Sequence, residues 1–282
     1  MTIAHTAPLN GSVLPEFFQN IFRREPLFAG TTVLLILLAV PLLAASALEQ
    51  RTLFDINVWI KPLKFDLALI VYLGTMAWFA TWLPEGVTEA RWYKTFSVIV
   101  VSAVALEMVW IIGAAANGIE SHFNSSTPFM ALLYPIMGAL AVTLTTATLI
   151  YGLVFLRDTD SALNPAFRLS LAWGLILTFV LTVSAAGLMV VNGGHFVGGN
   201  LSDAEAFPLM GWATDGGDLR VPHFFATHAM HFIPAFGFVA GAVLPKGLAR
   251  ASVYLASAGF TGFVAYTVYE AMNGLPFLGL VL

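Results

Sequence analysis

The chain has 282 residues, of which 59% are hydrophobic and only 10% are charged, and its formal net charge is -4 at pH 7. This composition lies far outside the usual range for a soluble domain and predicts a polytopic membrane protein. The acidic balance argues against a nucleic-acid partner. Because the sequence contains no cysteine, disulfides, thiolate metal sites and cysteine-ligated iron–sulfur clusters are excluded.

The apolar residues form long blocks, each close in length to the ~20 residues that a helix needs to cross the hydrocarbon layer. Such blocks favour helices over the alternating strands of a barrel. The prediction is an all-α protein with one transmembrane domain over residues 27–282 after a cytoplasmic segment over residues 1–26. Seven spans are expected in chain order, at about residues 27–48, 59–83, 93–115, 128–156, 167–191, 222–244 and 251–272.

The basic residues beside the spans predict the orientation. One side of the predicted topology holds Arg23, Arg24, Arg91, Lys94, Arg157, Arg168, Lys246 and Arg250, and the other holds Arg51, Lys61, Lys64 and Arg220. The side with more basic residues is expected to be cytoplasmic, so the N-terminus lies inside and the C-terminus outside. The one long loop between spans, residues 193–221, then lies outside.

On this topology the ionisable residues of the spans gather near their outer ends, and the inner half is nearly all apolar or small. They are accompanied there by five of the six histidines, namely His122, His195, His223, His228 and His231. Charged groups are costly in lipid and are generally paired or functional. The clustering therefore predicts a shared polar cavity that opens outward.

The histidine spacing admits several interpretations. His228 and His231 are three residues apart and can face one ion or one cavity from a single helix face. His223 joins them only if the helix begins after it, and His231 is the deepest and least supported of the three. The spacing is not a specific metal signature, so these histidines could instead hold helix ends together or carry protons.

The leading hypothesis is a site for Zn, Fe, Cu or haem b that performs redox or hydrolytic chemistry on a lipophilic substrate. Its candidate ligands are His122, His195, His223 and His228. Its candidate catalytic residues are Glu107, as ligand or proton acceptor, and Asp218, which would orient a histidine or Arg220. An anionic group of the substrate or cofactor would be bound by Lys61, Lys64 and Arg220. Lys61 could equally be an interfacial lysine that extends toward the head groups.

Two alternatives come from other classes of function. The same residues could form the proton relay of a proton-coupled transporter, or the chain could be a non-catalytic subunit or assembly factor of a membrane complex. The sequence argues against a retinal protein, because the seventh predicted span contains no lysine that could form a Schiff base with retinal.

Four short elements carry a resemblance. They are W-x-K-P-x-K-F at residues 59–65, S-H-F-N at 121–124, G-x-H at 193–195 and G-G-D-L-R-V-x-H-F-x-x-x-H at 216–228. As a set they resemble an uncharacterised family of bacterial integral membrane proteins. The resemblance implies a multi-pass protein of the bacterial inner membrane and carries no activity with it.

Overall fold

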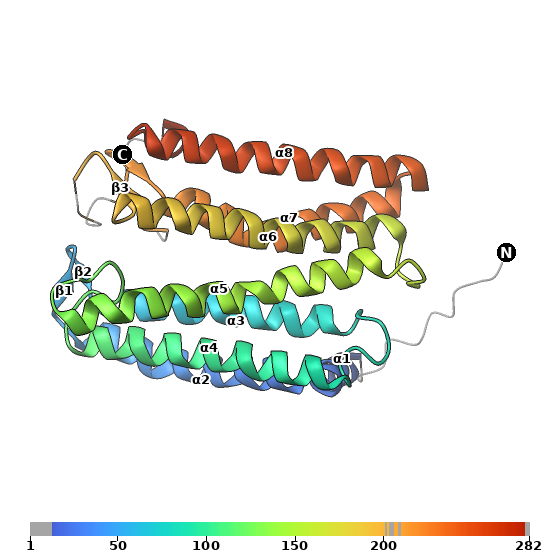
Figure 1. The fold of residues 1–282 in the computed structure, drawn as a ribbon, viewed down its shortest axis with the longest axis horizontal. Coiled ribbons are helices and arrows are strands. Elements are labelled where there is room, and N and C mark those ends of the chain that lie inside the picture. The colour runs from blue at the N-terminus through green and yellow to red at the C-terminus, as the bar shows by residue number, and fades with distance from the viewer. Residues whose placement is uncertain (1–12, 201, 203–205, 208–209, 280–282) are drawn as a thin grey trace.

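Seven long helices run alongside one another in the computed structural model (Figure 1), which describes residues 13–200, 202, 206–207 and 210–279. All seven are long and apolar enough to cross a membrane: α2 (Pro26–Leu48), α3 (Ile60–Ala80), α4 (Arg91–Ala116), α5 (Pro128–Arg157), α6 (Pro165–Asn192), α7 (Arg220–Val243) and α8 (Lys246–Met272). The prediction of an all-α polytopic protein with seven spans is confirmed. Large apolar side chains on the outer surface, such as Leu34, Val191 and Leu255, are exposed where lipid would contact them.

Capping residues explain why most helix boundaries lie near the predicted ones. Proline occupies the first position of α2, α5 and α6, where its missing N–H costs no hydrogen bond. The side chains before these prolines, Glu25, Thr127 and Asn164, each accept a hydrogen bond from a backbone N–H of the first turn. The largest difference is at α8, which begins five residues early because Lys246 and Arg250 belong to the helix although hydropathy excluded them.

A further helix, α1 (Val13–Arg24), was not expected from hydropathy. It places Phe17, Phe18 and Phe22 on its exposed surface, while its polar residues include Arg23. An amphipathic helix of this kind is too polar overall to register as a span. It lies within the segment that was predicted as the N-terminal extension.

The helices form two groups that meet along α5 and α6. Figure 1 shows α2, α3, α4 and α5 on one side and α6, α7 and α8 on the other. The main apolar core is built largely from the first group and includes Phe28, Leu73 and Phe155. In the second group α6 and α7 approach closely, because a Cβ on Gly237 would lie 2.0 Å from the Ser170 hydroxyl oxygen.

Because the spans alternate in direction, the two ends of the bundle carry different connections. One end, here called the hairpin end, holds the antiparallel pair β1 (Thr52–Leu53) and β2 (Ile56–Asn57), and the pair β3 (Phe196–Val197) and β4 (Gly217–Asp218). The short turn η1 (Phe277–Gly279) follows α8 there. The opposite end, here called the α1 end, holds α1 (Figure 1). The predicted orientation of the termini stays a prediction.

Candidate functional site

The loop that follows α6 covers the hairpin end and is held by Asp218. The Asp218 carboxylate, which is buried, accepts bonds from the Arg220 guanidinium (2.6 Å), the Arg220 backbone N–H (2.8 Å) and the Ala213 N–H (2.9 Å). The pairing of Asp218 with Arg220 was one of the predicted roles. Since both carboxylate oxygens are engaged within the loop, these contacts favour a structural role, and catalysis by Asp218 stays a prediction.

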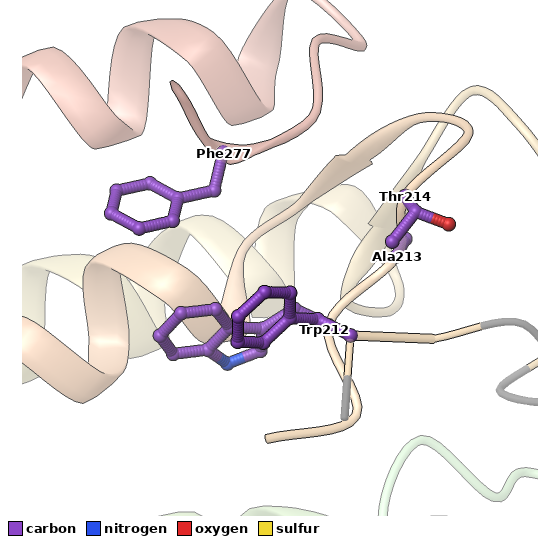
Figure 2. A pocket seen from close by; sticks show the side chains of 5 residues that line it. Trp212, Ala213, Thr214 and Phe277 are labelled. Carbon is purple, nitrogen blue, oxygen red and sulfur yellow. The ribbon is translucent and has the colours of Figure 1, made fainter. Parts of the chain in front are cut away.

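Aromatic packing fastens the same loop to α7 and to the C-terminal turn. Trp212 lies 5.4 Å from Phe224 and 5.5 Å from Phe277 between ring centroids. Figure 2 shows Trp212 and Phe277 around a small hollow, also lined by Phe207, Ala213 and Thr214. Its volume of about 10 Å³ is close to the room needed by one water. This hollow is therefore a packing feature rather than a substrate site.

Two further contacts bring the loop over α3 and the first hairpin. The Lys64 ammonium donates a hydrogen bond to the Met210 carbonyl at 3.1 Å. The Ser202 hydroxyl donates a hydrogen bond to the Asp55 carboxylate at 2.7 Å. Gly217 of β4 lies so close to α8 that a Cβ would be 2.0 Å from the Ala271 carbonyl oxygen. The hairpin end is thus covered by a segment with several independent anchors.

Beneath this cover, Lys61 interacts electrostatically with Glu107 and with His122. Neither Glu107 oxygen, although buried, has a hydrogen-bond partner among the described residues. The His122 Nδ1 lies 3.0 Å from the Ser121 hydroxyl. Burial, with smaller contributions from Lys61 and His223, lowers the pKa of His122 from 6.5 to about 3, so this imidazole is neutral at pH 7.

A hydrogen-bonded chain runs deeper into the bundle from α7 to α3. The Nδ1 atoms of His228 and His231 lie 3.1 Å apart, and the Nε2 of His231 lies 3.0 Å from the Thr75 hydroxyl. His231 is about 16 Å along α7 from its start at 1.5 Å per residue, so the chain lies well inside the span. His223 interacts electrostatically with both His228 and His122 and so connects this chain to the Lys61 region.

This chain has two equivalent proton arrangements. In a neutral imidazole one ring nitrogen donates and the other accepts. If Nδ1 of His228 donates, His231 accepts at Nδ1 and donates from Nε2 to Thr75. If Nδ1 of His231 donates, its Nε2 accepts from the Thr75 hydroxyl. A proton that arrives at Nε2 of His228 converts the first arrangement into the second, because each ring then passes its own proton on and the Thr75 hydroxyl releases one as it receives one.

Two further spans, α3 and α8, each carry a buried carboxyl. Asp66 on α3 is fully buried, and neither of its oxygens has a hydrogen-bond partner among the described residues. Glu270 on α8 is also buried and interacts with the Tyr266 hydroxyl. Carboxyls at such positions in a span are functional candidates by default.

The four predicted ligands do not gather around one point. His122, His223 and His228 form a sequence of electrostatic neighbours, whereas His195 lies in the loop, where its carbonyl accepts from the Leu219 N–H (2.8 Å) and its ring packs on Phe196. Within the described residues no group of three or more histidine, aspartate or glutamate side chains is arranged to hold a metal ion. The metal and haem assignment stays a prediction.

A second polar cluster, at the α1 end, contradicts the expectation of a nearly apolar inner half. Glu25 is 1% exposed and accepts from the Ser97 hydroxyl at 3.2 Å and the Phe28 N–H at 3.3 Å. The Tyr93 hydroxyl interacts with the same carboxyl and is hydrogen-bonded to the Tyr151 hydroxyl. Glu25 is the only carboxylate among the four side chains of this cluster, and it lies just outside the predicted span of residues 27–48.

Comparisons of the chain with protein-family models, with curated proteins and with solved structures give no significant match.

Proposed function

We propose that this integral membrane protein transfers protons through its helix bundle, with His228, His231 and Thr75 as the relay. The observation that carries the proposal is the continuous chain from the His228 ring through the His231 ring to the Thr75 hydroxyl. Chains of histidine and carboxyl groups inside spans are the common means of moving protons in pumps and transporters. The proposal develops one of the alternatives predicted from the sequence, the proton relay of a proton-coupled transporter.

The residues near the relay supply a route to it from the hairpin end. His223 is an electrostatic neighbour of His228 on one side and of His122 on the other. Lys61 offsets the charge of Glu107 when that carboxyl is ionised. Protons arriving at the hairpin end would therefore pass from the Glu107 and His122 region to His223 and then to the relay.

The test is proton flux into proteoliposomes that contain the pH dye pyranine, with the flux driven by a potassium gradient and valinomycin. The wild-type protein is expected to acidify or alkalinise the lumen faster than protein-free liposomes. His231→Gln retains a polar side chain of similar size but has no second ring nitrogen to pass a proton on. This variant is expected to fall to the protein-free rate.

The matched control is His195→Gln, a histidine at the same end that stands outside the relay. It is expected to keep the wild-type flux, provided that its melting temperature in detergent shows a folded protein. A wild-type rate equal to that of protein-free liposomes, or full activity of His231→Gln, would refute the relay.

The metal or haem hypothesis makes a different prediction for the same preparation. It expects stoichiometric Zn, Fe or Cu, or a haem absorption band, in the purified protein, with loss of that signal in His223→Gln and His228→Gln. The relay hypothesis predicts that the proton flux is unchanged after treatment with a chelator. A colourless, metal-free and folded protein would contradict the metal or haem hypothesis and leave the relay standing.

A further inference from the structure

The helix α1 has three faces that differ in burial and polarity. Ile21 is buried where α1 packs against α2 and α3. Phe18 and Phe22 are four residues apart, so they share a second face, and both rings are exposed. Gln19 and Arg23 share a third face, about 100° further round the helix, and they are exposed as well. One side of α1 therefore faces the bundle, one presents apolar rings and one presents polar groups.

The break between α1 and α2 makes α1 a separate helix rather than the first turns of a span. Glu25 between them has a φ of -142° and a ψ of 75°, which are not helical values, and Pro26 begins α2. After this break the exposed surface of α2 is apolar, with Leu27 and Leu34 among its exposed residues. The exposed rings of α1 therefore adjoin, along the chain, the surface of α2 that lipid would contact.

A row of aromatic rings at the α1 end connects α1 with both groups of helices. Between ring centroids, Phe17 lies 6.3 Å from Trp78 near the end of α3, and Trp78 lies 5.0 Å from Trp82. Trp82 in turn lies 5.2 Å from Phe167 at the start of α6. Trp78 is itself exposed. Because tryptophan is enriched where a membrane meets water, these rings indicate the depth of that boundary, and α1 lies beside it.

We infer that α1 is an interfacial helix, with Phe18 and Phe22 among the phospholipid acyl chains just beneath the head groups and with Gln19 and Arg23 in water. A helix with aromatic residues on one face and polar residues on the other binds a bilayer with its apolar face buried about 5–10 Å into this boundary. Phospholipid is the occupant because the exposed rings continue the lipid-facing surface of α2. The inference is independent of the relay, since it concerns how α1 is held in the bilayer and not how protons move.

The experiment measures the depth of single side chains by spin labelling. The sequence contains no cysteine, so each substitution introduces the only thiol to be labelled. Phe18→Cys and Phe22→Cys are compared with Gln19→Cys and Arg23→Cys in bilayers of phosphatidylcholine and phosphatidylglycerol. Molecular oxygen concentrates among the acyl chains and a nickel chelate in water, so their collision rates with the label report its depth. The expected result is a higher rate with oxygen than with nickel at positions 18 and 22, and the reverse at positions 19 and 23.

A lipid-exposed position within a span calibrates these rates. Leu34→Cys on α2 supplies it, and melting temperatures close to that of wild type show that each labelled protein is folded. A higher rate with nickel at all four α1 positions would place α1 in water and overturn the inference. Low rates with both reagents at positions 18 and 22 would show that protein, such as a second copy of the chain, covers these rings, and would also overturn it.

A second comparison needs no label. Phe18→Asp places a carboxylate where the inference places acyl chains, so the amide hydrogen exchange of α1 in the same bilayers is expected to rise above that of wild type. The matched control, Gln19→Asp, adds a carboxylate to the polar face of the same turn and is expected to leave the exchange unchanged. Equal exchange of α1 in the two variants would contradict the inference, whatever the proton flux of either protein.

Discussion

The two ends of the bundle bury ionisable groups in different ways. At the hairpin end the polar groups lie under a long loop that Asp218, Lys64 and Trp212 anchor. At the α1 end Glu25 is buried directly between helices and needs no such loop. Burial lowers the pKa of His122 and raises that of Glu25, so both ends favour the uncharged form of an ionisable group.

This difference implies that the two ends open differently. The hairpin end can be exposed by moving one loop, whereas exposing Glu25 requires α2 and α4 to separate. Local opening should therefore require less free energy and occur faster at the hairpin end than at the α1 end.

The largest expected effect comes from releasing the loop. Asp218→Ala removes the acceptor of the Ala213 N–H and of the Arg220 guanidinium, and it should cost about 1–3 kcal/mol, as leaving buried donors unsatisfied does. Hydrogen exchange should rise over residues 210–225 and stay low around Glu25. The control is Glu49→Ala, which removes a partly exposed carboxylate from a pair of the same spacing, Glu49 with the exposed Arg51, and should change stability less. Equal losses in the two variants, or equal exchange at both ends, would contradict the proposed difference.

An intermediate effect is expected where the relay crosses from α7 to α3. Thr75→Val removes the hydroxyl bonded to His231 and should cost only about 0.6–1.7 kcal/mol, the range for hydrogen bonds between membrane helices. The proton flux should nevertheless be lost, whereas Thr75→Ser should keep both stability and flux. A large loss of stability with normal flux in Thr75→Val would show that this bond serves packing alone.

The sequence predicted the seven spans and the polar character of the hairpin end, because charged and histidine residues stand out against apolar helices. It ranked His231 below His223 and His228, although His231 makes both hydrogen bonds of the relay. Depth along one helix does not reveal a partner, and a threonine such as Thr75 is ordinary in a span.

The α1-end cluster was not predictable from the same signals. Tyrosine and serine barely change the hydropathy of a span, so Tyr93, Tyr151 and Ser97 gave no signal in the sequence. Their meeting with Glu25 joins three helices, and it depends on how those helices rotate and pack. A single sequence does not specify that packing.

The smallest expected effect is on the pH dependence of stability, and its sign differs between the ends. The folded pKa of His122 is below its unfolded value, so the stability it contributes is present above pH 6.5 and is lost as the pH falls toward 3. The folded pKa of Glu25 is above its unfolded value, so its contribution is present below pH 4.5 and is lost as the pH rises through the folded pKa.

Melting temperatures measured in detergent across this pH range show how the stability changes with pH on the acid side and at higher pH. His122→Gln should flatten the decline on the acid side, and Glu25→Gln should flatten the decline at higher pH. If neither substitution alters the pH dependence of the melting temperature in its own pH range, burial does not hold these two groups uncharged.

The central claim is that His228 and His231 share a proton, and nitrogen NMR of the histidine-labelled protein in bilayers tests it most directly. At neutral pH the predicted spectrum has one protonated Nδ1 hydrogen-bonded to one unprotonated Nδ1, and His231→Gln should abolish this pair of signals. The contradicting result is a spectrum in which both Nδ1 atoms are unprotonated, with each ring carrying its proton on Nε2. In that state no proton lies between the two rings, and they cannot act as a relay.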